Sequence, residues 1–343
     1  MSVKASFQND PRLPAFNPSC LHKGRHATIH RIFMTAPLTI RDAFPVAPAL
    51  RRVLWIGPTD GLELSMACAA ISAQADVTCA ESVQEAVSGA AIAGADFGIL
   101  AADRPGRFTL ADSLLLSQTW PLLPIVSVVS SLVDGRRRSG PAFPGIEEVP
   151  WHELAGRCGW WLASLEAGLP TSLGLPATAR REERLLESIG DIRRRTAAPG
   201  AAVDVAVAAG RAVDLEGLCD LLTLTGHRVV ERHHGRPDLG ALAPALIWDV
   251  GDLNPDALAW LGLLAANRPG LFIVLLDSFP RGDTSQAAAR AGAAAVLGRP
   301  VSLETLAGTL LRRAWHPSWG RAARSSPAEH ALHAGLGRSG PTR

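Results

Sequence analysis

Short apolar runs alternate with segments of helical periodicity from Arg51 onward. Apolar runs of four to six residues between polar turns are typical of strands that are buried on both faces, and their alternation with helices indicates a parallel sheet. The first half of this pattern predicts strands at residues 53–57, 76–79, 97–101 and 125–129, and helices at residues 61–73, 83–93 and 151–167. We expect residues 51–168 to form a five-stranded α/β sandwich.

The same order recurs after Ala201. The pattern predicts strands at residues 203–208, 228–231, 245–248, 271–276 and 294–297, and helices at residues 214–224, 254–266, 285–291 and 302–313. Three pairs of equivalent positions, namely Val53 with Val203, Ala101 with Asp249 and Pro150 with Pro300, are separated by 150, 148 and 150 residues. So steady an offset predicts that residues 201–313 are a second copy of the first domain.

The linker, residues 169–200, contains a charged segment with helical spacing. Within residues 177–196, one apolar stripe is expected from Leu185, Leu186, Ile189 and Ile192. The preferred interpretation is a helix that packs on its own domains. The alternative is a helix through which two copies of the chain form a homodimer, although two heptads are few for a stable coiled coil.

Both ends of the chain lack a periodic pattern. Residues 1–50 mix Pro, Asn, His and Arg, and residues 314–343 are rich in Ser, Gly and Pro, so we expect both to be disordered. Met34 is a plausible alternative start, which would make residues 1–33 a mis-assigned leader. An organelle transit peptide is the other interpretation of this basic segment.

Composition narrows the class of protein. Hydrophobic residues make up 47% of the 343 residues and charged residues 19%, as in globular proteins. Five scattered cysteines lack the spacing of zinc ligands or of a disulfide framework, and no apolar run approaches the roughly 20 residues that cross a bilayer. The net charge of +2 comes from basic ends around a mildly acidic centre. We therefore expect a soluble cytoplasmic protein that binds neither nucleic acid nor membrane.

One stretch near the end of the second half suggests a family. The residues from Gly292 to Pro300 read as a turn, a buried strand and a basic residue before proline, and an amphipathic helix follows. About fifty residues earlier, Asp249 ends another buried strand. This arrangement resembles the receiver (CheY-like) domain of two-component response regulators. The resemblance implies two flavodoxin-like, doubly wound sheets of five parallel strands, joined by a helical linker.

The receiver resemblance implies a specific chemistry in the second domain. Phosphoryl transfer to an aspartate needs a nucleophile, a Mg²⁺ held by an acidic pair, a cation and a hydroxyl group. The phosphoacceptor position falls on Asp249, and the basic position falls on Arg299, directly before Pro300. Arginine keeps the positive charge, but its planar guanidinium can hold a carboxylate as easily as a phosphate.

The remaining positions of the second domain depart from the receiver pattern. Gly210 and Arg211 follow the first strand where the acidic pair belongs, and Asp214 and Glu216 are expected to lie too far into the helix to replace it. The hydroxyl position falls on Asp277, or on Leu276 if the register slips by one residue. A carboxylate there would repel a phosphoryl group about 5 Å away by roughly 3 kcal/mol at an effective dielectric constant near 20.

The first domain departs further from the pattern. Its phosphoacceptor position is Ala101, the residue before Pro150 is Val149, and only Asp60 lies near the place of the acidic pair. Asp103 is a possible shifted acceptor, but we interpret it as a solvated loop carboxylate. The basic run at residues 136–138 is expected to replace the fourth helix by a loop.

The whole chain thus resembles a tandem of degenerate pseudo-receivers. We expect an adaptor of phosphorelay signalling that binds a histidine kinase or other signalling proteins and is not an enzyme, with no cofactor and no metal. One alternative is a response regulator phosphorylated at Asp249, with Mg²⁺ held by Asp252 or Asp277. The other is a nucleotide-binding enzyme of doubly wound type, which is disfavoured because the turns at residues 57–61 and 209–211 supply neither a GxGxxG nor a GxxxxGK[ST] motif.

Overall fold

The computed structural model describes residues 51–89, 94–134, 146–169, 171, 173, 181–196, 201–240 and 243–315. All of these belong to one compact unit, Ala47–Arg343. Residues 1–50 and 314–343 were predicted to be disordered. Apart from the end of the last helix, they lie outside the described residues, and so does the basic run at residues 136–138.

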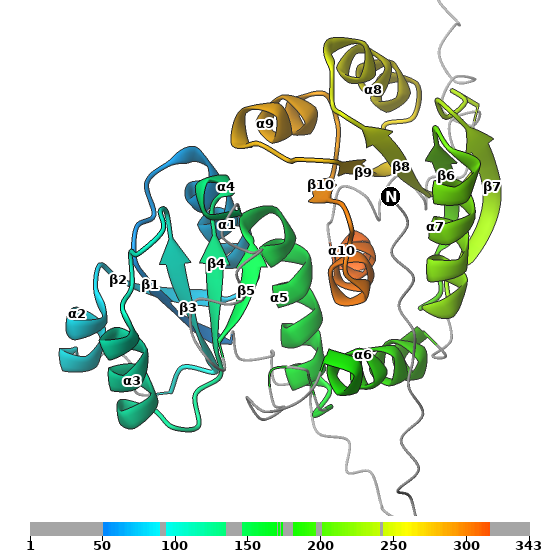
Figure 1. Cartoon of the computed structure of the whole chain (residues 1–343). Coiled ribbons are helices and arrows are strands. Elements are labelled where there is room, and N and C mark those ends of the chain that lie inside the picture. Colours follow the sequence, from blue (N-terminus) through cyan, green and yellow to red (C-terminus); the bar gives the residue numbers. More distant parts are fainter. Residues whose placement is uncertain are drawn as a thin grey trace, which may run out of the picture. The chain divides into compact units, whose positions relative to one another are not determined.

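The first sheet contains five parallel strands in the order β2-β1-β3-β4-β5 (Figure 1). The strands are β1 (Arg52–Ile56), β2 (Asp76–Ala80), β3 (Phe97–Ala102), β4 (Ile125–Val129) and β5 (Glu147–Pro150). One face packs against α1 (Leu62–Ser72) and α5 (Trp151–Glu166). The other packs against α2 (Val83–Ser88), α3 (Leu110–Thr119) and α4 (Ser131–Asp134).

The second sheet repeats this order as β7-β6-β8-β9-β10, again with every described pairing parallel. The strands are β6 (Asp204–Ala209), β7 (Arg228–His234), β8 (Ala245–Gly251), β9 (Phe272–Asp277) and β10 (Ala295–Gly298). One face is covered by α7 (Ala212–Leu224) and α10 (Leu303–Trp315), and the other by α8 (Pro255–Asn267) and α9 (Gly282–Arg290). Among the described helices, none combines the length and the apolar character that crossing a membrane requires.

The predicted fold class is confirmed: both sheets have the 2-1-3-4-5 order of flavodoxin-like, doubly wound proteins, the order also found in CheY. Two local predictions need correction. Helix α3, which the sequence pattern did not suggest, begins at a capping box formed by Thr109 and Asp112. The fourth helix is not wholly replaced by a loop, because the single turn α4 remains directly after β4.

Some apolar residues of the linker helix α6 (Arg181–Thr196) are buried and others are exposed. Ile192 is fully buried and Ile189 packs against the same core, whereas Leu185 and Leu186 are exposed. The expected single stripe of four residues is therefore wrong. The buried side of the helix includes two polar residues instead, since Ser188 donates to Glu304 and Asp191 lies beside Ser164.

Helices α5 and α10 cross at close range, and this contact joins the two sheets within the unit. At the crossing, a Cβ added to Gly308 would collide with the carbonyl oxygen of Gly156, and a Cβ added to Gly156 would lie 2.6 Å from the carbonyl oxygen of Thr305. Leu303 and Ala307 of α10 consequently belong to the core of the first sheet, beside Trp160. The two glycines allow the backbones to touch.

A buried charge network surrounds this crossing. The guanidinium of Arg157 pairs with Glu304 at 3.1 Å and also with Glu147, and Thr305 Oγ1 donates to Glu153 at 2.9 Å. Burial alone would lower the pKa of Arg157, but the nearby carboxylates, first Glu304 and then Glu147, raise it above its usual value. Arg157 therefore stays charged, and its carboxylate partners come from both halves of the chain.

We predict that Gly308→Ala lowers the free energy of unfolding by about 2–3 kcal/mol, because the new methyl group must push two packed helices apart. Gly262→Ala is the matched control: Gly262 lies within α8 with open space around its Cβ position, so alanine should raise the free energy of unfolding by up to about 1 kcal/mol. Urea unfolding measures both. Equal effects of the two substitutions would show that the crossing is not closely packed.

Candidate functional site

The carboxyl edge of the second sheet brings Asp249 and Arg299 together. Asp249 lies near the end of the central strand β8 and is buried, and Arg299 directly follows β10 in a cis peptide bond with Pro300. Arg299 Nη1 donates to Asp249 Oδ1 at 2.9 Å, and the same oxygen accepts the Gly251 N–H at 3.1 Å. Ligands of open α/β sheets bind at this edge.

Arg299 also contacts a second carboxylate, which the sequence did not lead us to expect. Its Nη2 lies 3.4 Å from Asp214 Oδ2, and the Nε of Arg211 lies 3.6 Å from the same oxygen. From the sequence, Asp214 was expected to lie too far into its helix to replace the acidic pair. Helix α7 begins at Ala212, two residues before the predicted start, so Asp214 is its third residue and lies in the first turn. The first turn of α7 therefore presents Asp214 to the sheet edge. The result is a chain of alternating charges, Arg211, Asp214, Arg299 and Asp249.

Burial and the charge of Arg299 shift the pKa of Asp249 in opposite directions. Burial raises the pKa of Asp249 above its ordinary value and outweighs Arg299 and the Gly251 N–H, which both lower it, while nearby Asp214 raises it further. Arg299 therefore favours the charged form of this carboxylate. A phosphoryl donor would have to displace this guanidinium before reaching Asp249 Oδ1.

Asp277 does not join this cluster, and of the two residues expected at the hydroxyl position it is the alternative, Leu276, that takes it. In the strand register Leu276, not Asp277, lies beside Asp249, so the side chain of Asp277 is directed to the opposite face of the sheet. Asp277 Oδ1 accepts the Phe279 N–H at 3.2 Å, and burial raises the pKa of Asp277 although backbone N–H groups, including that of Leu253, lower it. The repulsion expected from a carboxylate at the hydroxyl position therefore does not arise.

The equivalent edge of the first sheet is apolar where the second is charged. Ala101 and Val149 are buried, and Asp60 is exposed in the turn after β1. Asp103 directly follows β3, not two residues beyond the strand, and pairs with Arg104 at 3.1 Å. None of these side chains contacts another in the manner of Asp249 and Arg299.

Two hydroxyl residues after β4 were missed in the sequence. Ser131 donates from both its N–H and its Oγ to the carboxylate of Glu63, each at 2.7 Å, and Ser130 Oγ donates to the Asp103 carbonyl at 2.8 Å. Glu63 Oε1 also accepts the Gly282 N–H of α9 at 3.3 Å. The signal was present, because a Ser-Ser pair follows the fourth strand directly. An internal carboxylate thus occupies these donors in the first domain.

The residues at the second edge do not fit a Mg²⁺ ion. Among the described residues, no group of three His, Cys, Asp or Glu side chains is placed to hold a metal. The position after β6 carries Arg211, and the two nearby carboxylates already share Arg299. A divalent cation there would meet two guanidinium groups and lack the oxygen ligands it prefers.

No protein-family model and no curated protein matches the chain. Solved structures match it in part. A pilus assembly protein from Burkholderia thailandensis is 29% identical, with a TM-score of 0.31 over 33% of this chain and 99% of that chain. A pilus-assembly-related protein from Burkholderia pseudomallei is 23% identical, with a TM-score of 0.30 over 34% of this chain and 91% of that chain. A receiver domain protein from Clostridium thermocellum is 15% identical, with a TM-score of 0.28 over 35% of this chain and 97% of that chain. The fold assignment rests on strand order and parallel register.

We predict that Arg299→Met lowers the free energy of unfolding at pH 8 by about 2 kcal/mol, because Asp249 is left buried without its cation. The loss should shrink at pH 5. Without Arg299 the pKa of Asp249 rises further, so as the pH falls through that value the folded state takes up a proton before the unfolded state does and is stabilised.

Arg211→Met serves as the matched control for this experiment. Its guanidinium is largely exposed and contacts only Asp214 in the described cluster, so we expect a change below about 0.5 kcal/mol at either pH. Urea unfolding at both pH values tests the pair of variants. A pH-independent loss for Arg299→Met would show that Asp249 does not depend on the guanidinium.

Proposed function

We propose that this chain is an adaptor of two-component signalling whose receiver-like domains bind partner proteins without phosphoryl transfer. The observation that carries the proposal is the alternating chain of Arg211, Asp214, Arg299 and Asp249. It supplies the acceptor carboxylate with a permanent counter-ion and leaves no set of oxygen ligands for Mg²⁺. Such a site would hold one conformation, and we propose that the protein is not an enzyme and uses no cofactor.

Partner proteins would bind helical faces other than those of α5 and α10. These two helices are packed on each other, and their facing residues are buried. We propose signalling proteins, a histidine kinase among them, as the partners. A homodimer through residues 177–196 also stays a proposal, and it would have to use Leu185 and Leu186, because Ile189 and Ile192 pack internally.

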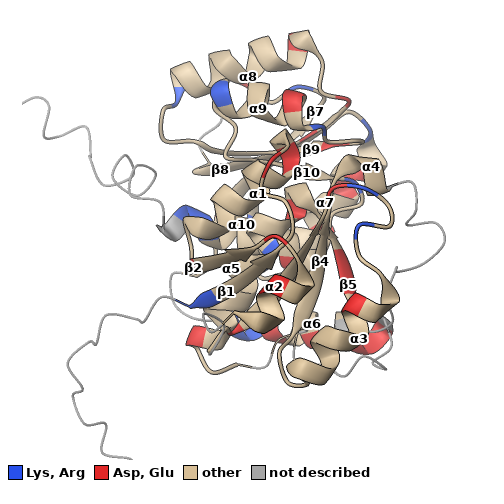
Figure 2. Ribbon diagram, turned by 90° about the vertical axis from the view of Figure 1, so that its left-hand side faces the viewer, with Lys and Arg blue, Asp and Glu red and all other residues tan. Residues whose placement is uncertain are grey.

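Charge distribution supports a protein partner. In the view of Figure 2, acidic and basic positions are interspersed along the described ribbon. Nucleic-acid binding depends on a concentration of Lys and Arg that neutralises phosphates. We therefore propose that the protein acts through protein contacts in the cytoplasm and binds neither nucleic acid nor membrane.

We predict that the full chain gains no phosphate when it is incubated with Mg²⁺ and acetyl phosphate, because Arg299 holds Asp249 and no metal site is assembled. Intact-mass spectrometry of the wild type and of Asp249→Asn should give the same result. The affinity for a histidine kinase that binds the chain should differ by less than about twofold between the two proteins. A Mg²⁺-dependent phosphate on the wild type alone would instead identify a phosphorylatable regulator.

A further inference from the structure

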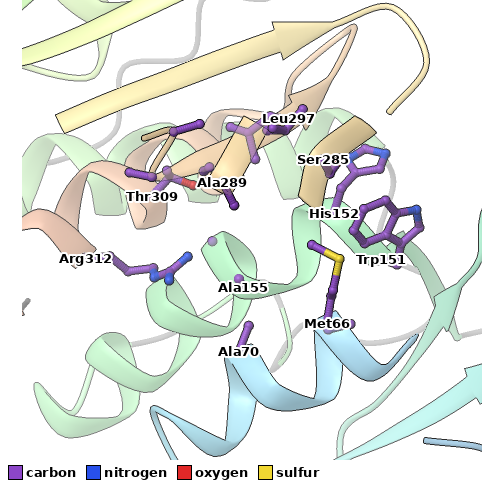
Figure 3. A pocket seen from close by; sticks show the side chains of 16 residues that line it. Met66, Ala70, Trp151, His152, Ala155, Ser285, Ala289, Leu297, Thr309 and Arg312 are labelled. Carbon is purple, nitrogen blue, oxygen red and sulfur yellow. The ribbon is translucent and has the colours of Figure 1, made fainter. Parts of the chain in front are cut away.

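A cavity of about 160 Å³ lies where α1, α5, α9, β10 and α10 meet (Figure 3). Its walls are mostly apolar and small, with alanines from α1, α5, α9 and β10 next to Met66 and Leu297. This volume is close to the roughly 150 Å³ of cavities that bind one benzene molecule. The cavity therefore has room for an apolar group of a few carbon atoms.

One end of the cavity carries a cation, Arg312, for which no described residue supplies a counter-ion. Figure 3 shows the guanidinium of Arg312 reaching toward the cavity beside Ala155. Burial lowers the pKa of Arg312, and no described carboxylate opposes this effect or lies within ion-pair distance. Leaving a desolvated guanidinium unpaired is unfavourable, so this end of the cavity favours an anion.

Two other polar side chains that line the cavity are buried donors. Ser285 is buried, and neither its Oγ nor the Nε1 of Trp151 has a hydrogen-bond partner among the described residues. Both residues line the cavity, and both groups can donate a hydrogen bond.

We propose that this cavity binds a small monocarboxylate with a short aliphatic body. The carboxylate pairs with Arg312, and the aliphatic body lies against the alanines of α1 and α9. Cations are disfavoured by the guanidinium, and inorganic anions would leave the apolar walls exposed to water. The site does not depend on the phosphate chemistry of Asp249, so either proposal can fail alone.

The ligand would contact both halves of the chain. Met66 and Ala70 belong to α1 of the first half, and Ser285 and Arg312 belong to the second. A ligand that binds only the folded arrangement stabilises it in proportion to its occupancy. Binding would thus strengthen the association of the two sheets that the α5 and α10 crossing already provides.

Hexanoate is a suitable probe, with 1-hexanol and hexylamine as uncharged and cationic counterparts of similar size. The full chain is labelled with ¹³C at its methionine methyl groups, and the Met66 signal is assigned with Met66→Leu; the sequence has only three methionines. We expect the Met66 signal to shift with hexanoate and to give a Kd of about 0.1–1 mM, with binding to hexanol or hexylamine at least roughly tenfold weaker.

Substitutions then separate charge from volume. Arg312→Gln should weaken hexanoate binding roughly ten- to hundredfold, Arg312→Lys should retain most of it, and Ala70→Leu should abolish it by filling the cavity. Arg313→Gln, the adjacent residue that does not line the cavity, is the matched control and should bind like the wild type. Equal affinities for hexanoate and hexanol, unchanged binding in Arg312→Gln, or no Met66 shift at about ten times the expected Kd would each overturn the proposal.

Discussion

The crossing of α5 and α10 is the contact on which the arrangement of this protein depends. Gly156 and Gly308 bring the two backbones together, and Arg157 holds carboxylates from both halves beside them. A buried ion pair contributes little net stability over apolar packing, but removing one partner leaves a charge buried and is strongly destabilising. The glycines therefore allow the two backbones to approach each other closely, and separating the helices would leave buried charges of the network unpaired.

That crossing also bears on the proposed adaptor role. In a doubly wound domain the outer helical faces are the surfaces available to partners, and here each half has committed one of them to the other half. The charged edge of the second sheet is likewise closed, since Asp249 is paired through Arg299 to Asp214. A scaffold with its edge and one face satisfied internally is suited to a fixed docking platform and offers little for a phosphate to change.

The fold could be predicted from apolar periodicity, because strands buried on both faces leave a strong signal and the same signal occurs twice. Local errors arose where tertiary contacts outweighed the pattern. Leu185 and Leu186 fit a helical stripe with Ile189, yet α6 buries Ser188 and Asp191 instead, since those polar side chains find partners on α10 and α5. At the site, Asp249 and Arg299 were predictable from their places at strand ends, whereas Asp214 and Ser131 depend on where a helix begins.

The sequence by itself determined the two parallel sheets, most of their helices and the absence of a carboxylate pair directly after β6, because each follows from residue type at a fixed place within one element. Only the tertiary structure decided which carboxylates share Arg299, which face Asp277 occupies and where the cavity beside Arg312 lies. These features join residues that lie far apart in the sequence, such as Asp214 and Arg299, which are 85 positions apart. Strand register, helix starts and close backbone contacts set them, and none of these is encoded by local periodicity.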